Sequence, residues 1–97
     1  MASVTHIIHN AWAVNFNLPL QAFEGLISGV RCLIEASVSA THPVKLLVTS
    51  SIGVASRWNP THGLVPERTL DNPDIASANG YTASKYVTEA VSTVLYI

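Results

Sequence analysis

The sequence predicts an α/β fold with a parallel sheet, part of a doubly wound domain. Two short β-branched and apolar runs, residues 4–9 and 44–49, flank a segment of helical periodicity at residues 20–37. A long loop follows, and a second helical segment begins near Tyr81. Strands that alternate with helices form parallel sheets with right-handed crossovers. Because two strands alone make a marginal sheet, we expect residues 1–97 to be the middle of a larger domain.

The individual elements carry three further expectations. The run at residues 44–49 is largely apolar, which predicts a strand buried on both faces. Gly25 and Gly29 cost helical stability relative to alanine, so we expect them to allow close packing against the sheet. The loop over residues 53–79 contains Gly, Pro, Asn and Asp with little periodicity. Loops of this length without regular structure are uncommon and often functional.

Composition limits the classes of function. The chain is 48% hydrophobic and 11% charged, against about 25% charged residues in ordinary domains. A chain of 97 residues this apolar cannot cover itself with polar surface, which favours the interior of a larger assembly. A net charge of -1 does not favour nucleic acid or anionic membranes. A single cysteine, Cys32, no signal peptide and no apolar run of about 18 residues predict a cytoplasmic protein.

Tyr81 and Lys85 are the residues that best indicate chemistry. Four residues apart at the start of a helix, they share one face. Free tyrosine has a pKa near 10, and a nearby ammonium lowers the pKa of a phenol by favouring the phenolate. Ser50 and Ser51 end the second strand, where open α/β sheets bind ligands, and a hydroxyl there can hold a substrate carbonyl oxygen. The order of these features predicts a nicotinamide-dependent carbonyl reductase.

Plainer readings of the same residues stay open. A tyrosine–lysine pair at this spacing arises by chance in about 6% of chains of this composition, and the serines could simply end a strand. The four histidines lack a ligand spacing, so we expect no metal site. Aromatic residues in the first strand–helix connection and in the long loop are expected to be core or pocket walls, because no basic residues interleave with them. These are Trp12, Phe16 and Trp58.

The motif TSSIG at residues 49–53, followed by GYTASK at residues 80–85, resembles the extended short-chain dehydrogenase/reductase superfamily. Upstream, HIIHNAW at residues 6–12 is similar to a narrower group. This group is the thioester reductase domains of fungal adenylate-forming reductases, nonribosomal-peptide-synthetase-like enzymes and carboxylic acid reductases. The resemblance covers residues 4–95 and implies the central part of a Rossmann-like domain.

The resemblance implies a role for each matching residue. Tyr81 would be the general acid, and Lys85 would assist it and bind the nicotinamide ribose. Ser51 would hold the carbonyl oxygen of the substrate, with Ser50 as the second choice because the register is uncertain by one residue. The implied reaction is hydride transfer from NADPH to an acyl thioester on the phosphopantetheine arm of a carrier protein. An aldehyde is released, or an alcohol after a second reduction.

The cofactor site implied by the resemblance is incomplete. Asn10 and Ala11 would lie against the NADP ribose and pyrophosphate, but the chain lacks the N-terminal Gly-rich half that cradles a pyrophosphate. We therefore expect a fragment that is not active alone. Two alternatives stay open: a non-catalytic remnant that associates with other chains through exposed sheet surface, and an extended reductase acting on a nucleotide sugar.

Overall fold

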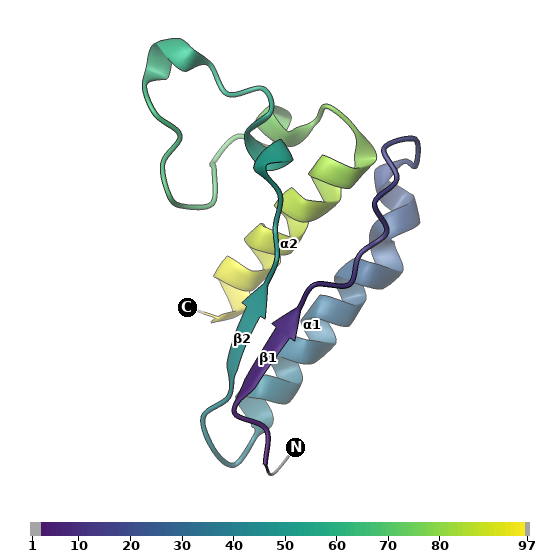
Figure 1. Ribbon diagram of the computed structural model, residues 1–97, viewed down its shortest axis with the longest axis vertical. Helices are drawn as coiled ribbons and strands as arrows, with labels where there is room; N and C mark the ends of the chain where they lie inside the picture. The colour runs from purple at the N-terminus through teal and green to yellow at the C-terminus, as the bar shows by residue number, and fades with distance from the viewer. Residues whose placement is uncertain (1–2, 97) are drawn as a thin grey trace.

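The computed structural model describes residues 3–96 and has the predicted order of elements (Figure 1). Strand β1 covers His6–His9, helix α1 covers Glu24–Ser39, strand β2 covers Lys45–Val48 and helix α2 covers Gly80–Tyr96. A 3-10 turn, η1 at Leu20–Phe23, leads directly into α1. The fold is therefore α/β, as expected, with each boundary within a few residues of the sequence pattern.

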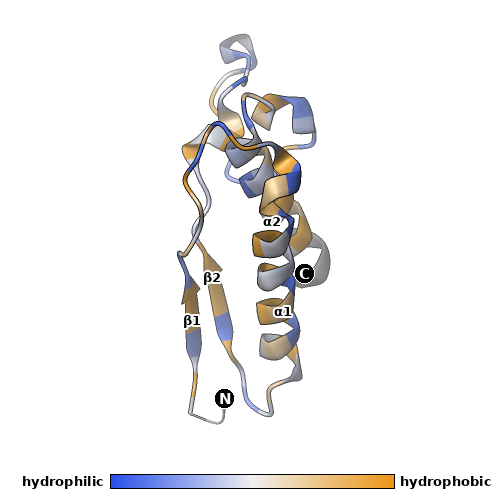
Figure 2. Ribbon diagram, turned by 90° about the vertical axis from the view of Figure 1, so that its right-hand side faces the viewer, coloured by the Kyte–Doolittle hydropathy of each residue, from blue (hydrophilic) through white to orange (hydrophobic). Residues whose placement is uncertain are grey.

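The two strands form a parallel sheet, and both helices cover the same face of it (Figure 2). The register pairs Ile7 with Leu46 and Ile8 with Leu47. The core between sheet and helices is built mainly from α1 and the segments that touch it. Its buried apolar residues are Phe23, Val30, Ile34, Val44, Leu70 and Ala76.

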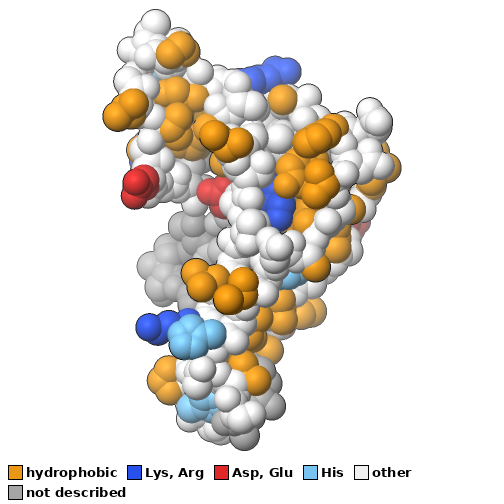
Figure 3. Space-filling view, in the orientation of Figure 1, with side chains coloured by type: hydrophobic (Ala, Val, Ile, Leu, Met, Phe, Trp, Pro, Cys, Tyr) orange, Lys and Arg blue, Asp and Glu red, His pale blue; other side chains and the backbone are white. Residues whose placement is uncertain are grey.

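The second face of the sheet is uncovered, so the expectation of a strand buried on both faces was wrong. Ile8 is 72% exposed and its partner Leu47 is 58% exposed. Hydrophobic side chains lie on this side of the molecule beside histidine and basic side chains (Figure 3). The physical reason is that no described segment packs there, since both helices lie on the opposite face. No helix among the described residues is long and apolar enough to cross a membrane.

The glycines of α1 do not pack against the sheet, which corrects a second expectation. A Cβ added to Gly25 or Gly29 would meet nothing within 4 Å, so both lie on the open side of the helix. The close approaches occur elsewhere. A Cβ at Gly80 would lie 2.1 Å from the carbonyl oxygen of Leu18, and one at Gly53 would lie 2.3 Å from Cγ2 of Thr82.

The long loop is ordered by short 3-10 turns rather than being structureless. These are η2 at Ile52–Ala55, η3 at Pro60–His62 and η4 at Pro73–Ala76. At the start of each turn a polar side chain accepts a backbone N–H from two residues further on; the accepting side chains are those of Ser51, Asn59 and Asn72. Side-chain capping of this kind supplies the hydrogen bonds that the missing helix or strand ladder would supply.

Alanine substitutions at two glycines separate these two packing environments. Gly29→Ala should raise the free energy of unfolding by about 0.5–1 kcal/mol, because alanine is the better helix former and the site is open. Gly80→Ala should lower it by about 1–3 kcal/mol, because the new methyl group meets backbone atoms that cannot rotate away. Urea unfolding followed by circular dichroism measures both. Equal effects at the two sites would contradict this packing.

Candidate active site at the start of helix α2

The first turn of α2 is fixed by the loop that precedes it. Asn79 caps the helix by accepting the backbone N–H of Thr82 at 2.9 Å. The hydroxyl of Thr82 donates in turn to the carbonyl oxygen of Ala76 at 2.7 Å. These bonds set the rotation of the helix about its axis and hence the direction in which the side chains of Tyr81 and Lys85 project from it.

Tyr81 is half-buried between two aromatic rings. The ring of Phe16 lies edge-on at 5.2 Å between centroids, and the ring of Phe23 lies at 6.4 Å. Offset and edge-on pairs of this kind hold an aromatic ring in one orientation. Within the described chain the phenolic hydroxyl makes no hydrogen bond, so it is available to a ligand.

Lys85, one turn further along α2, is almost completely buried, with 3% of its surface exposed. Its ammonium donates to the carbonyl oxygen of Thr49 at 2.7 Å and lies 4.3 Å from the centre of the Trp12 ring. No carboxylate of the described residues lies within ion-pair distance of it. Burial therefore lowers the pKa of Lys85 below its ordinary value.

The two serines that follow β2 have different hydrogen bonds. The hydroxyl of Ser50 donates to Oε2 of Glu89 at 2.7 Å. The hydroxyl oxygen of Ser51 accepts the backbone N–H of Gly53 at 3.1 Å, and its own proton has no acceptor among the described residues. Only Ser51 therefore keeps a donor for a carbonyl oxygen.

Asn10 and Ala11 lie in the segment that leaves β1, at the same edge of the sheet as Ser50 and Ser51. Both are exposed, and neither contacts Tyr81 or Lys85 through a described hydrogen bond. The residue of this segment that does reach α2 is Trp12. Its indole N–H donates to the hydroxyl of Ser84 at 3.1 Å.

The expectation that Trp12 is a core or wall residue leaves out its polar contacts. The ring is half-buried, but it also makes polar and cationic contacts with two consecutive residues of α2. Its place two residues after Asn10 was the available signal, and its partner could not be read from the sequence because 72 residues separate Trp12 from Ser84.

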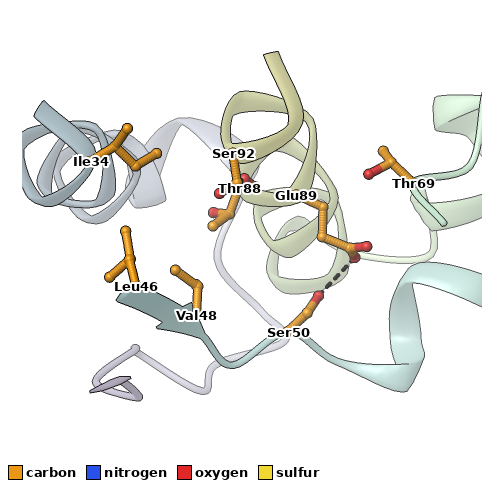
Figure 4. Close-up of a pocket in the computed structure, with 8 residues that line it drawn as sticks. All are labelled: Ile34, Leu46, Val48, Ser50, Thr69, Thr88, Glu89 and Ser92. Atoms are coloured by element: carbon orange, nitrogen blue, oxygen red, sulfur yellow. Dashed lines mark hydrogen bonds between the residues drawn. The ribbon is translucent and has the colours of Figure 1, made fainter. Parts of the chain in front are cut away.

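A cavity of about 270 Å³ lies elsewhere, between β2 and the two helices (Figure 4). Apolar side chains of α1 and β2 meet hydroxyl and carboxyl groups of α2 and the loops there. The hydroxyls of Thr88 and Ser92 already donate to helix carbonyl oxygens. The lining residues are Ile34, Leu46, Val48, Ser50, Thr69, Thr88, Glu89 and Ser92. Tyr81, Lys85 and Ser51 do not line it, so of the predicted site residues only Ser50 borders this cavity.

The histidines are scattered rather than clustered. Within residues 3–96, no group of three or more His, Cys, Asp or Glu side chains is arranged to hold a metal ion. His9 instead stacks edge-on with Trp12, with 6.0 Å between the ring centroids.

The burial of Lys85 makes stability depend on pH. Its pKa is 10.5 in a model peptide and lower in the folded chain, so the unfolded chain binds more protons just below pH 10.5. The free energy of unfolding should therefore rise as the pH rises from the folded-state pKa to 10.5. Lys85→Met should remove this rise, whereas Lys45→Met, at an exposed lysine, should keep it. Urea unfolding at a series of pH values tests this, and parallel curves for wild type and Lys85→Met would refute it.

Comparison with known proteins finds relatives over nearly the whole chain. A carboxylic acid reductase of Neurospora crassa is 40% identical over 91 residues, 94% of this chain and 9% of that protein. Adenylate-forming reductase Nps9 of Serpula lacrymans is 42% identical over 93 residues, 94% of this chain and 8% of that protein. A non-reducing polyketide synthase, pkiA of Emericella nidulans, is 38% identical over 91 residues, 90% of this chain and 3% of that protein. No protein-family model matches the chain.

These matches confirm the narrower resemblance drawn from the sequence. The chain spans less than a tenth of the length of these two relatives, so the sequence identity concerns one segment of each. The chain therefore corresponds to one segment of the large fungal carboxylic acid reductases and adenylate-forming reductases.

Proposed function

We propose that the chain is the Tyr–Lys segment of an NADPH-dependent thioester reductase with a doubly wound, Rossmann-like domain of the extended short-chain dehydrogenase/reductase type. The observation that carries the proposal is the buried ammonium of Lys85. It lies one helical turn from Tyr81 and is held by the carbonyl oxygen that follows β2. A buried cation that has no carboxylate partner among the described residues is costly, and such groups cluster at functional sites.

The side chains fit the nicotinamide end of such a cofactor. Lys85 has three N–H donors, of which one is used by Thr49, so two remain for a ribose hydroxyl and a neighbouring group. Asn10 and Ala11 follow the adjacent strand and would approach the ribose and pyrophosphate. None of the five glycines lies in the connection between β1 and α1, residues 10–23, so this segment does not supply a pyrophosphate cradle. When bound, NADPH supplies the hydride.

In the proposed reaction, each side chain acts on the carbonyl group of an acyl thioester. Ser51 donates a hydrogen bond to the carbonyl oxygen, because its proton is free and that of Ser50 is not. As hydride adds to the carbonyl carbon, Tyr81 gives its proton to the oxygen. The C–S bond then breaks as the proton of the new hydroxyl passes to the departing sulfur, which releases an aldehyde and the thiol of the carrier arm. A carrier-bound substrate is supported by the adenylate-forming reductases and polyketide synthases among the relatives. We place this activity in the cytoplasm, where the exposed thiol of Cys32 would stay reduced.

A chimera tests these roles in a protein of full length. Residues 4–95 would replace the matching segment of the Neurospora crassa carboxylic acid reductase. We expect the chimera to form aldehyde, and Tyr81→Phe to lower kcat by about 10²–10⁴-fold while the protein still binds NADPH. Ser51→Ala should lower kcat by about 10²-fold, and Ser50→Ala should have a much smaller effect.

Single-turnover assays of NADPH oxidation and aldehyde formation measure these changes. The paired serine variants are the internal control, because the two residues are adjacent and equally small. A folded chimera in which Tyr81→Phe turns over normally would remove Tyr81 from its role. A larger effect of Ser50→Ala than of Ser51→Ala would reverse the assignment of the serines.

A second candidate function is association through the uncovered sheet. Parallel sheets are normally covered on both faces, and here Ile8 and Leu47 stand exposed in register. The strand β2 also has a free edge. Since the N–H groups of Lys45 and Thr49 bond to β1, those of Leu46 and Val48 point away from it. An exposed apolar face beside an unpaired edge favours pairing with another chain.

Charge substitutions on the open face test this association. Leu47→Lys should shift the isolated chain toward the monomer in sedimentation velocity, because it places a charge at the centre of the face. Val38→Lys, at an apolar position of α1 that is 68% exposed, should leave the distribution unchanged. Equal effects of the two variants would show that general solubility, rather than this face, governs association.

A further inference from the structure

We propose that Trp12 is the positioning residue of Lys85: the face of its indole holds the ammonium, and its ring N–H fastens the indole to α2. The catalytic meaning of this role rests on the proposed function. The contacts themselves do not, because they lie entirely within this chain and need neither cofactor nor substrate.

The two contacts involve opposite parts of one ring and consecutive residues of one helix. The ammonium of Lys85 lies 4.3 Å from the ring centre, well inside the distance at which a cation is attracted to the face of an indole. The ring N–H donates to Ser84, which has no exposed surface and whose hydroxyl donates to the carbonyl oxygen of Tyr81 at 2.6 Å. The indole is thus anchored one residue away from the cation it faces.

Few groups near Lys85 other than the indole can stabilise its charge. Titratable neighbours are Tyr81 one turn before it, Glu89 one turn after it, and His9, whose ring lies edge-on to that of Trp12. Glu89 accepts from Ser50 and is not within ion-pair distance of the ammonium. The carbonyl oxygen of Thr49 and the face of Trp12 are therefore what offsets the loss of water around the charge.

The same ring also fixes the path of the chain after β1. Trp12 is two residues beyond Asn10, which leaves β1 at the sheet edge where the cofactor is expected. A ring fastened to Ser84 restricts where residues 10–12 can run. One side chain therefore ties the proposed ribose-binding segment to the helix that carries Tyr81 and Lys85.

Nitrogen-15 NMR of the lysine ammonium groups tests the role on the intact 97-residue chain. The chain has two lysines, so exposed Lys45 serves as the internal reference. In Trp12→Leu the apolar cover stays and the aromatic face is lost, so the pKa of Lys85 should fall further. In Trp12→Phe an aromatic face returns, and the pKa should move back toward that of the wild type.

Two outcomes would overturn the proposal. An unchanged pKa in Trp12→Leu would show that the ring only packs, and a rise toward the ordinary value would show that it only keeps water out. Helical circular dichroism checks folding, and Trp12→Met is a second non-aromatic variant should Trp12→Leu unfold. Trp58→Leu, which removes the indole bonded to Gly63 in the loop, is the matched control and should leave Lys85 unchanged.

Turnover separates this proposal from the proposed function. In the active chimera, Trp12→Leu should lower kcat roughly tenfold and Trp12→Phe should restore most of it. If the chimera is inactive but the NMR result holds, the positioning role stands and the reductase assignment fails. If the chimera is active and the kcat of Trp12→Phe is no higher than that of Trp12→Leu, the positioning role fails.

Discussion

The close contact between the first turn of α2 and the segment after β1 is the constraint on which the candidate site depends. Gly80 lies directly against the backbone of residues 18–20, where there is no room for a side chain. This approach brings Phe16 onto Tyr81 and Trp12 onto Lys85 from a distant part of the sequence. The tyrosine and lysine are adjacent because of the helix, but their surroundings come from this contact.

The elements were predictable because their signals are local. Apolar periodicity marked both helices, and β-branched runs marked both strands. Burial was less predictable, because it depends on what lies across the interface. Leu47 belongs to an apolar run typical of a covered strand, yet it is exposed because no described segment covers that face. The expectation that Gly29 packs closely against the sheet was wrong for the same reason: a small residue permits a close contact but does not create one.

The site shows a similar division. The spacing of Tyr81 and Lys85 predicted that they share a face, and the position of Ser50 and Ser51 placed a hydroxyl at the edge of the sheet. The choice between the serines required the hydrogen bonds, because a one-residue shift along the turn decides which hydroxyl meets Glu89 and which caps η2. The role of Trp12 was beyond the sequence, since a cation–π contact has no spacing rule when 73 positions separate its partners.

The candidate site and the sheet also differ in what they need from outside the chain. The ring and hydrogen-bond partners of the Tyr81 and Lys85 side chains lie in residues 12–23 and 49, and the loop before α2 supplies the bonds that fix its first turn, so the arrangement is internal to this segment. Among residues 3–96, no segment covers the outer apolar face of the sheet or pairs with the outer edge of β2. If the proposed function holds, the acid would be arranged within these residues, while the binding of the proposed cofactor would also depend on parts outside them. A segment that covers less than a tenth of its relatives can therefore still bury Lys85 one helical turn from Tyr81, because the contacts that do so lie within the segment.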